Sequence, residues 1–465
     1  MELSPFLSVY KRYSKYTTQV HTCHPKTPAD FGQLIEMDID RYGDFIKTIF
    51  VKMTLPPTFS DYIYTGSPGL HIFEYIELII GDTIIDRVDG YYMSLYYGTR
   101  FSSDMDGQTF NESFGGDISN MSEYIPPNGL TQIGQNRQTC YTTDRNRTIF
   151  FPIPFYFMNK PTLAIPLCLL KQQEVKLRFK LRPWQDMLIK NIEYAQNLKY
   201  LREPADLTIQ GGGPLQLVDL SVPVEFAYVS DEDFKTISSK PCIHYITQKQ
   251  LQIVSVGTEN SVKALLEFAN PVKCLHFFTR YDNPNGMIYR NQYNERKNKA
   301  RLEKGKAWAH HIQSIQLEFD NEVFLHREIA NYQFLTHTQR VLHAGTPFQS
   351  TILNIISTMN VVSATRELYP NSASKVLTGP AYMYSFALDP FSETPTGTIN
   401  FSAIRYPYIQ LNMFSADVNG VYPNVSGQPI EPRSVYIYAE SFNVLTFLPN
   451  EGVARFAFHN PILKK

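Results

Sequence analysis

The sequence has little net charge of either sign. It contains 43 basic and 44 acidic residues among 465, so no overall field draws the chain toward nucleic acid or an anionic membrane. Apolar runs are short, and one of the longest, Leu163 to Leu170, falls far below the ~20 residues of a membrane-spanning helix. The opening Met-Glu-Leu-Ser-Pro does not resemble a secretory signal. We expect a soluble chain without specific nucleic-acid binding.

Cysteine is scarce and scattered. The five cysteines are Cys23, Cys140, Cys168, Cys242 and Cys274. Their odd number and the lack of a Cys-x-x-Cys pair argue against a disulfide framework and favour free thiols in a reducing compartment. His21-Thr-Cys23-His24 is the only tight cluster of soft metal ligands in the sequence, and it lacks further ligands at zinc-finger spacing. We therefore predict no metal site and no cofactor.

The common signatures of enzymes are also missing. The sequence contains no G-x-S-x-G, H-E-x-x-H, P-loop or dinucleotide fingerprint. His310 and His311 are neighbours in sequence and would face opposite sides of a strand, so they make a poor ligand pair. The eleven histidines are otherwise dispersed. We predict no catalytic residue and no enzymatic activity.

Aromatic residues and proline, in contrast, are abundant. The chain has 30 Tyr, 31 Phe and 30 Pro, and its charged fraction of 19% is below the usual quarter. Aromatic side chains pack well on pleated surfaces, and proline suits turns and sheet edges. The length allows two domains with separate cores. These features predict an all-β fold of many short strands.

Strand patterns are clearest in the first half. Phe45 to Leu55 forms a long candidate strand after the turn Asp40–Asp44. Gly81-Asp82 separates two apolar runs, His71–Ile80 and Thr83–Val88, which is a strong hairpin signal. Glu174 to Arg182 alternates strictly, as a half-buried strand does.

Short helices are expected at two places. Gly90 to Tyr97 is predicted to form an aromatic helix. Ser230, followed by three acidic residues, resembles a helix N-cap, and the polar stretch down to Lys240 is a candidate linker.

The second half repeats the pattern of the first. Each half ends with an alternating strand, a polar excursion and a long strand, at 174–182 and 215–229, then at 408–413 and 434–447. This predicts a duplicated eight-stranded unit, and therefore two tandem jelly rolls. The predicted units are an N-terminal arm, a first jelly roll and a second jelly roll, at residues 1–24, 25–236 and 237–465.

Three features keep more than one interpretation, and residues 100–147 are considered with them. Tyr10–Tyr16 alternates bases with aromatics, so the arm could bind nucleic acid or an anionic surface, or lie along a neighbouring subunit. Residues 100–147 form a polar excursion at an exposed end. The basic run Arg296–Lys306 is either a solvated loop or a contact for an acidic or phosphate-bearing partner. Glycan attachment stays open at the sequons of Asn111, Asn120, Asn146, Asn400 and Asn424.

The stretch from Tyr382 to Arg405 is predicted to form a strand, a turn-rich loop and a second strand. Ser385-Phe-Ala-Leu388, followed by Pro395-x-Gly-Thr-x-Asn-Phe-Ser402, resembles the late-domain signature of the major capsid proteins of nucleocytoplasmic large DNA viruses. Further blocks resemble this family in the same order, at Glu77–Asp86, Ile149–Arg182, Asn270–Lys273 and Tyr436–Leu445.

The resemblance implies a double jelly roll that assembles into pseudo-hexagonal homotrimers. These would tile the icosahedral shell of a large double-stranded DNA virus, with minor capsid and penton proteins as partners and an internal membrane layer beneath. It also implies a place in the virion capsid, with synthesis and assembly in the host cytoplasm. It carries no residue-level contact for the arm, the 100–147 excursion or the basic loop.

A β-sandwich carbohydrate-binding protein or glycosidase is the alternative. Exposed aromatic rings could stack on sugars, and a glycosidase would need two carboxylates ~5–9.5 Å apart in a cleft. A flat-walled trimer without such a cleft would count against it.

Overall fold

A computed structural model describes the chain over residues 16–56, 62–64, 68–100, 147–158, 160–190, 215–257, 259–281, 312–343, 382–392, 394–413 and 433–458. The start of the arm, residues 101–146 of the predicted 100–147 excursion, the basic loop and His310-His311 lie outside these ranges. Their interpretations stay predictions.

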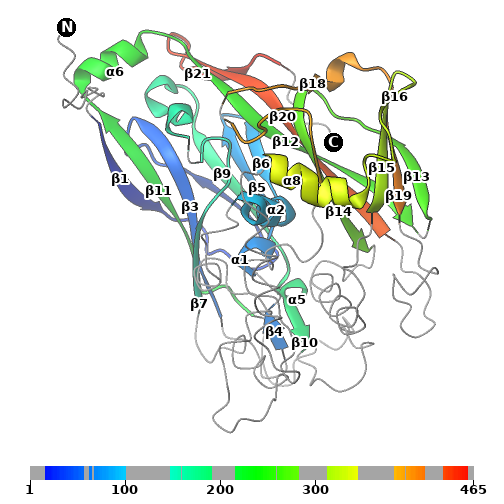
Figure 1. Ribbon diagram of the computed structural model, residues 1–465. Helices are drawn as coiled ribbons and strands as arrows, with labels where there is room; N and C mark the ends of the chain where they lie inside the picture. Colours follow the sequence, from blue (N-terminus) through cyan, green and yellow to red (C-terminus); the bar gives the residue numbers. More distant parts are fainter. Residues whose placement is uncertain are drawn as a thin grey trace, which may run out of the picture.

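The first β-sandwich consists of two antiparallel sheets (Figure 1). One sheet has the order β1 (Tyr16–Cys23), β11 (Asp219–Val229), β3 (Phe45–Leu55) and β7 (Arg147–Pro152), and the short β8 (Ile165–Pro166) also pairs with β3. The other has the order β2 (Leu34–Asp38), β9 (Val175–Leu181), β5 (Phe73–Ile80) and β6 (Thr83–Val88). A separate ribbon joins β4 (Tyr62–Tyr64) to β10 (Leu188–Lys190).

The second sandwich lies beside the first (Figure 1). Its larger sheet has the order β12 (Cys242–Gly257), β20 (Arg433–Leu448), β14 (Pro271–Tyr281) and β17 (Tyr382–Ser385), with β18 (Ile399–Asn400) on β14 and β21 (Val453–Phe456) on β20. Its smaller sheet has the order β13 (Ser261–Leu265), β19 (Pro407–Met413), β15 (Ile312–Phe319) and β16 (Glu322–Leu325).

The two sandwiches have the same strand arrangement. The order β1-β11-β3-β7 in the first corresponds to β12-β20-β14-β17 in the second, and β2-β9-β5-β6 corresponds to β13-β19-β15-β16. The long closing strands β11 and β20 occupy equivalent places, as do the alternating strands β9 and β19. This confirms the predicted all-β fold of two tandem jelly rolls.

Helices are short and lie between strands. They are α1 (Pro68–His71), α2 (Gly90–Arg100), α5 (Trp184–Met187), α6 (Asp231–Ser238) and α8 (Gln339–His343), with single turns η1 (Pro161–Leu163), η2 (Leu167–Leu169), η4 (Phe334–Thr338) and η6 (Phe401–Ala403). The predicted N-cap of α6 is confirmed, because the Ser230 side chain accepts a hydrogen bond from the Asp233 N–H. Among the described helices, none is long and apolar enough to cross a membrane.

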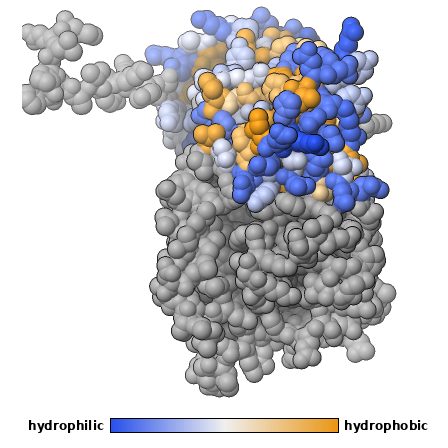
Figure 2. Space-filling view, turned by 45° about the vertical axis from the view of Figure 1, so that its right-hand side comes forward, coloured by the Kyte–Doolittle hydropathy of each residue, from blue (hydrophilic) through white to orange (hydrophobic). Residues whose placement is uncertain are grey.

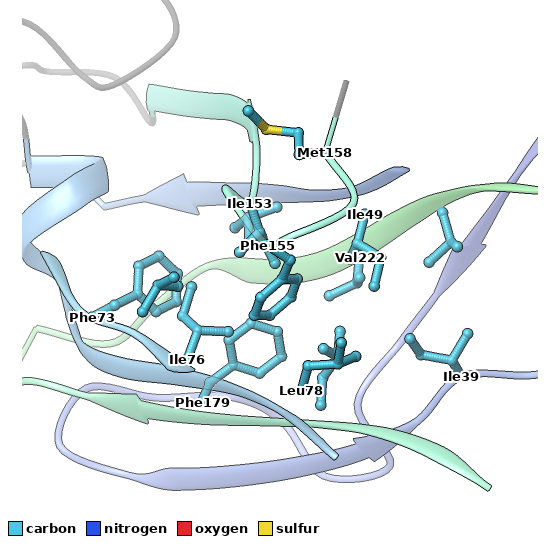
Figure 3. Close-up of a cluster of buried hydrophobic side chains, with 14 of the residues drawn as sticks. Ile39, Ile49, Phe73, Ile76, Leu78, Ile153, Phe155, Met158, Phe179 and Val222 are labelled. Carbon is cyan, nitrogen blue, oxygen red and sulfur yellow. The ribbon is translucent and has the colours of Figure 1, made fainter. Parts of the chain in front are cut away.

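Alternating side chains build the core of the first sandwich. Every second residue of β9 is buried, and Phe179 lies between the sheets with Phe73, Ile76 and Leu78 of β5 (Figure 3). Val222 and Ile49 come from the opposite sheet. Burying each such side chain stabilises the fold by about 1.5–3 kcal/mol, which explains why strictly alternating segments were predictable.

The strands β12 and β20 belong to both cores. Ile246, Leu445 and Phe447 are buried in the hydrophobic cluster of the first sandwich. Val254 and Ile437, farther along the same strands, are buried in the cluster of the second. The two jelly rolls are therefore packed against each other through shared strands and not merely linked by α6.

One sequence expectation needs correction. Tyr16–Cys23, assigned to the arm, form β1 and pair along their whole length with β11, which suits their β-branched and aromatic composition. Between β13 and β14, Asn270 has a φ of 66° and Pro271 follows it. The strands β17 and β18, predicted on either side of a turn-rich loop, both pair with β14 and not with each other.

Candidate functional site

The most unusual feature of the structure is a run of buried polar residues between the two jelly rolls. Thr247, Gln248, Lys249 and Gln250 are consecutive in the middle of β12, and each is no more than 8% exposed. Residues at both ends of β12 expose one face, but this middle part is covered on both. Buried polar groups must find hydrogen-bond partners. We call this region the polar seam, and define it by these four residues and their partners described below.

Lys249 crosses the seam to the first jelly roll. Its Nζ lies 2.6 Å from Asp86 Oδ2 and donates a second hydrogen bond of 3.1 Å to the Pro154 carbonyl. Asp86 also accepts hydrogen bonds from the Tyr156 and Arg87 N–H groups. Burial raises the pKa of the Asp86 carboxyl, whereas the lysine and the two N–H donors oppose this shift. Beside this pair, Gln248 donates to the carbonyl of Ile85.

Asp89 forms a second link across the seam. Its Oδ1 accepts hydrogen bonds from the N–H groups of Tyr91 and Tyr92, and so caps the start of α2. The Tyr438 hydroxyl of β20 lies 2.8 Å from both Asp89 carboxylate oxygens. Burial raises the pKa of Asp89. The cap of α2 is thus completed by the second jelly roll.

Glu440 is the centre of the third link. It is 1% exposed, and its Oε1 accepts a hydrogen bond of 2.9 Å from the Tyr92 hydroxyl. Lys273 Nζ lies 3.0 Å from Oε2, and His276 Nε2 lies 3.4 Å from Oε1. Lys273 and His276 both come from β14.

The capsid-like signature loop fixes the position of β14. The Lys273 carbonyl accepts hydrogen bonds from the N–H groups of Phe386 and Ala387. Asp389 and Thr396 close the loop through two hydrogen bonds, of 2.9 and 2.8 Å. Gly397 has a φ of 145°, and a Cβ there would lie 3.1 Å from the Phe386 carbonyl oxygen. The glycine of the signature is therefore required by the close approach of the two loop segments.

The buried contacts of the polar seam hold the two jelly rolls together. Its carboxylates Asp86 and Glu440 are at most 1% exposed and each lies against a lysine, so neither can reach an external substrate. A buried pair of this kind costs desolvation energy, but removing one partner costs more. The arrangement favours one docking of the two jelly rolls over others.

The histidine and cysteine residues that the sequence analysis considered make ordinary packing and hydrogen-bond contacts. The His21 ring stacks on Tyr42 at 4.3 Å, and its Nε2 lies 3.1 Å from the Tyr228 hydroxyl. Cys23 is buried, and burial raises the pKa of its thiol. No disulfide joins Cys23, Cys168, Cys242 or Cys274, the four cysteines among the described residues.

The sequence analysis did not identify the polar seam. Its residues come from distant segments, and only the fold brings them together. A signal was nevertheless present: Thr247–Gln250 is a polar run inside a long apolar strand, and Ser441 and Asn443 interrupt β20 opposite it. Both are buried, and they contact Gln250 and Gln248 respectively.

Comparison with known proteins connects this architecture to one family. The profile described as major capsid protein N-terminus matches residues 4–229, and the profile described as large eukaryotic DNA virus major capsid protein matches residues 234–453. The major capsid protein of Pyramimonas orientalis virus is 22% identical over 453 residues, covering 97% of this chain and 93% of that protein. Capsid protein 1 of Acanthamoeba polyphaga mimivirus is 26% identical over 300 residues, covering 60% of this chain but less than half (46%) of that protein.

A solved structure has the same fold. The PBCV-1 virus capsid, a quasi-atomic model, contains a chain that aligns with a TM-score of 0.66 at 20% identity, covering 98% of this chain and all (100%) of that one. The fold, the order of the two jelly rolls and the two matched profiles agree. The chain belongs to the major capsid proteins of large eukaryotic DNA viruses, a family of structural virion proteins and not of enzymes.

Proposed function

We propose that this capsid protein assembles as a homotrimer whose six jelly rolls give a pseudo-hexagonal building block of an icosahedral shell. The observation that carries this proposal is the docking of two topologically equivalent sandwiches through the polar seam. A rigid pair of similar sandwiches, repeated three times around an axis, presents six comparable side walls. Near-zero net charge limits repulsion between copies that pack side by side.

The β12 edge is the surface that we assign to contact between copies. Within the described residues β12 pairs only with β20, so none of the described strands covers its other edge. It exposes four large apolar side chains, Ile243, Tyr245, Leu251 and Ile253, between 43% and 58%. Exposed apolar edges favour association unless they are covered. Figure 2 shows apolar side chains gathered among polar ones on one face of the molecule, and such patches offer contacts in a shell.

Other partners follow from family membership. We infer that trimers contact minor capsid and penton proteins and lie over an internal membrane layer, and that the protein is made and assembled in the host cytoplasm. We also propose that the boundary between the jelly rolls falls at residues 236–237, near the end of α6. The carbohydrate-binding or glycosidase alternative is not retained, because the family is structural.

The mass of the purified protein in solution tests the trimer. Analytical ultracentrifugation or native mass spectrometry is expected to give three chain masses at micromolar concentration. A particle of one chain mass across the accessible concentrations would contradict the proposal.

A further inference from the structure

The Glu440 end of the polar seam contains three side chains that bind transition metals. Cys274 and His276 are separated by one residue on β14 and point to the same side of it as Glu440 on the neighbouring β20. Cys274 Sγ lies 3.4 Å from His276 Nε2, which in turn lies 3.4 Å from Glu440 Oε1. All three ligand atoms lie within 4.8 Å of one another. Across the part of the chain that the structure describes, this is the only group of three such ligands.

Two of the three separations match those of a tetrahedral zinc site. Zinc binds thiolate sulfur at ~2.3 Å and imidazole nitrogen or carboxylate oxygen at ~2.0–2.2 Å, which places ligand atoms about 3.3–3.6 Å apart at tetrahedral angles. The two measured separations fall in this range. All three side chains are at most 1% exposed, so their orientations are fixed by packing before any ion arrives.

His276 Nε2 is the ring nitrogen that faces the other two ligands. His276 Nε2 faces a sulfur and a carboxylate oxygen together, and one proton on that nitrogen can be donated to only one of them. The other ring nitrogen, Nδ1, is buried without a hydrogen-bond partner among the described residues, so Nε2 is the nitrogen with polar neighbours. A divalent cation would contact all three ligand atoms at once.

The contacts of Glu440 turn one carboxylate oxygen toward the cluster. Lys273 contacts Oε2, the oxygen farther from the cluster, while Oε1 is turned toward His276. The Tyr92 hydroxyl, from the first jelly roll, also donates to Oε1. Ligating carboxylates are commonly held by such outer hydrogen bonds.

We propose that Cys274, His276 and Glu440 bind one Zn²⁺ ion between β14 and β20. The three protein ligands leave a fourth position for a water molecule. The ion would join two neighbouring strands of the second jelly roll and would hold Glu440, whose Oε1 also accepts the hydrogen bond from Tyr92 of the first jelly roll. This assignment departs from the sequence analysis, which predicts no metal site, because strand pairing brings in Glu440 from far along the chain.

The chain contains a natural control for this proposal. Cys242 and His244 on β12 have the same Cys-x-His spacing, with Sγ 3.3 Å from Nε2. They do not belong to a group of three ligands within the described residues. A metal that needs only a Cys-x-His pair would bind at both places. The proposed site also requires Glu440, which only the Cys274–His276 pair has beside it.

The test uses the full-length protein, freed of metal with a chelator and then titrated with Co²⁺ as a spectroscopic probe for Zn²⁺. We expect one Co²⁺ per chain, with the thiolate charge-transfer band and the intense visible bands of tetrahedral Co²⁺. Cys274→Ser should abolish the charge-transfer band, Glu440→Gln should weaken Co²⁺ binding at least tenfold, and Cys242→Ser should leave the spectrum unchanged.

X-ray absorption of the Zn²⁺-loaded wild-type protein identifies the atoms bound to zinc without using a variant. It therefore tests the proposal even if a variant does not fold. One sulfur and three nitrogen or oxygen neighbours around zinc are expected. Absence of stoichiometric binding, a zinc shell without sulfur, or a charge-transfer band that disappears in Cys242→Ser instead would overturn the proposal.

Discussion

Lys249 and Asp86 are 163 residues apart in the sequence, yet their side chains meet at 2.6 Å between the two jelly rolls. Each belongs to a different sandwich, and both are buried. This pair, with Tyr438–Asp89 and the Glu440 cluster, makes the docking of the jelly rolls specific. A flat assembly wall requires that the two sandwiches keep a fixed relation, so the seam is where we expect mutations to act most strongly.

Removing the lysine of this pair should strongly destabilise the protein. Lys249→Met leaves the Asp86 carboxylate buried without its cation, and the free energy of unfolding should fall by about 3–5 kcal/mol. Urea denaturation of the purified protein measures this loss. The double variant Asp86→Leu/Lys249→Met should recover much of it, because no unpaired charge remains.

Lys263→Met is the matched control for Lys249→Met. Lys263 pairs with Glu318 on the surface, where its side chain is 48% exposed. Its loss should cost less than about 1 kcal/mol. Equal losses for the two lysine variants would contradict a special role for the seam.

The Tyr438 hydroxyl should also contribute measurably. Tyr438→Phe removes the hydroxyl donor that lies 2.8 Å from both Asp89 oxygens and leaves the carboxylate with backbone donors. We expect a loss of about 1–3 kcal/mol in the free energy of unfolding. Tyr245→Phe removes a hydroxyl from a residue that is 58% exposed, and it should change stability by only a few tenths of a kcal/mol.

Acid should destabilise the protein partly through His244. Burial lowers the pKa of His244 from 6.5 to about 4, so the unfolded chain binds a proton between these values that the folded chain does not. The His244 contribution to stability is therefore complete above pH ~6.5 and is lost as the pH falls toward 4. His244→Phe, which keeps a ring against Tyr156 and Phe447, should lose less stability between pH 7 and pH 4 than the wild type.

The comparison between variant and wild type isolates this effect. Burial raises the pKa values of Asp86 and Asp89, so these carboxyls contribute with the opposite sign, but they are present in both proteins. The difference should be on the order of 3 kcal/mol. Parallel stability curves for the two proteins from pH 7 to pH 4 would show that His244 does not titrate as described.

Gly397 should tolerate alanine less well than Gly257 does. Both have positive φ, at 145° and 59°, but a Cβ at Gly397 would lie 3.1 Å from a backbone oxygen, while a Cβ at Gly257 would meet nothing within 4 Å. Gly257→Ala should cost about 1 kcal/mol, from backbone strain alone. Gly397→Ala should cost more, and thermal unfolding compares the two. An equal cost would mean that the signature loop relaxes without penalty.

Charge on the β12 edge should weaken association without unfolding the chain. Tyr245→Glu and Ile253→Glu introduce carboxylates on side chains that are 58% and 52% exposed, so the fold should survive while the proposed trimer dissociates. Sedimentation velocity and circular dichroism measure the two properties separately. Ile329→Glu, at a side chain that is 57% exposed and lies outside β12, should leave the trimer intact. A trimer that survives both edge substitutions would exclude β12 from the interface.

Local patterns in the sequence predicted most of the architecture. Phe45–Leu55 and Thr83–Val88 were placed at their observed bounds, because alternation and glycine turns act over a few residues. The repeat of β9 and β11 by β19 and β20 was visible for the same reason. The pairing of β17 and β18 with β14 was not predicted, since it depends on which distant strand lies between them.

The seam was not predicted from the sequence, because residue types that are usually exposed are buried there. Lys273 is 2% exposed and Lys249 is 8% exposed, although lysine is among the residues least often buried. The carboxylate partners Glu440 and Asp86 make such burial tolerable, and each lies more than 150 residues away in the chain. Polar residues in the middle of a long strand are the observable sign of such an interface.

Electron cryo-microscopy of purified virions that contain this protein tests the central claim most directly. The account predicts a shell of pseudo-hexagonal blocks, each fitted by three copies of the chain with both jelly rolls in the relation set by Lys249–Asp86. A shell whose density accepts only one sandwich per chain, or virions in which the protein lies outside the shell, would contradict it.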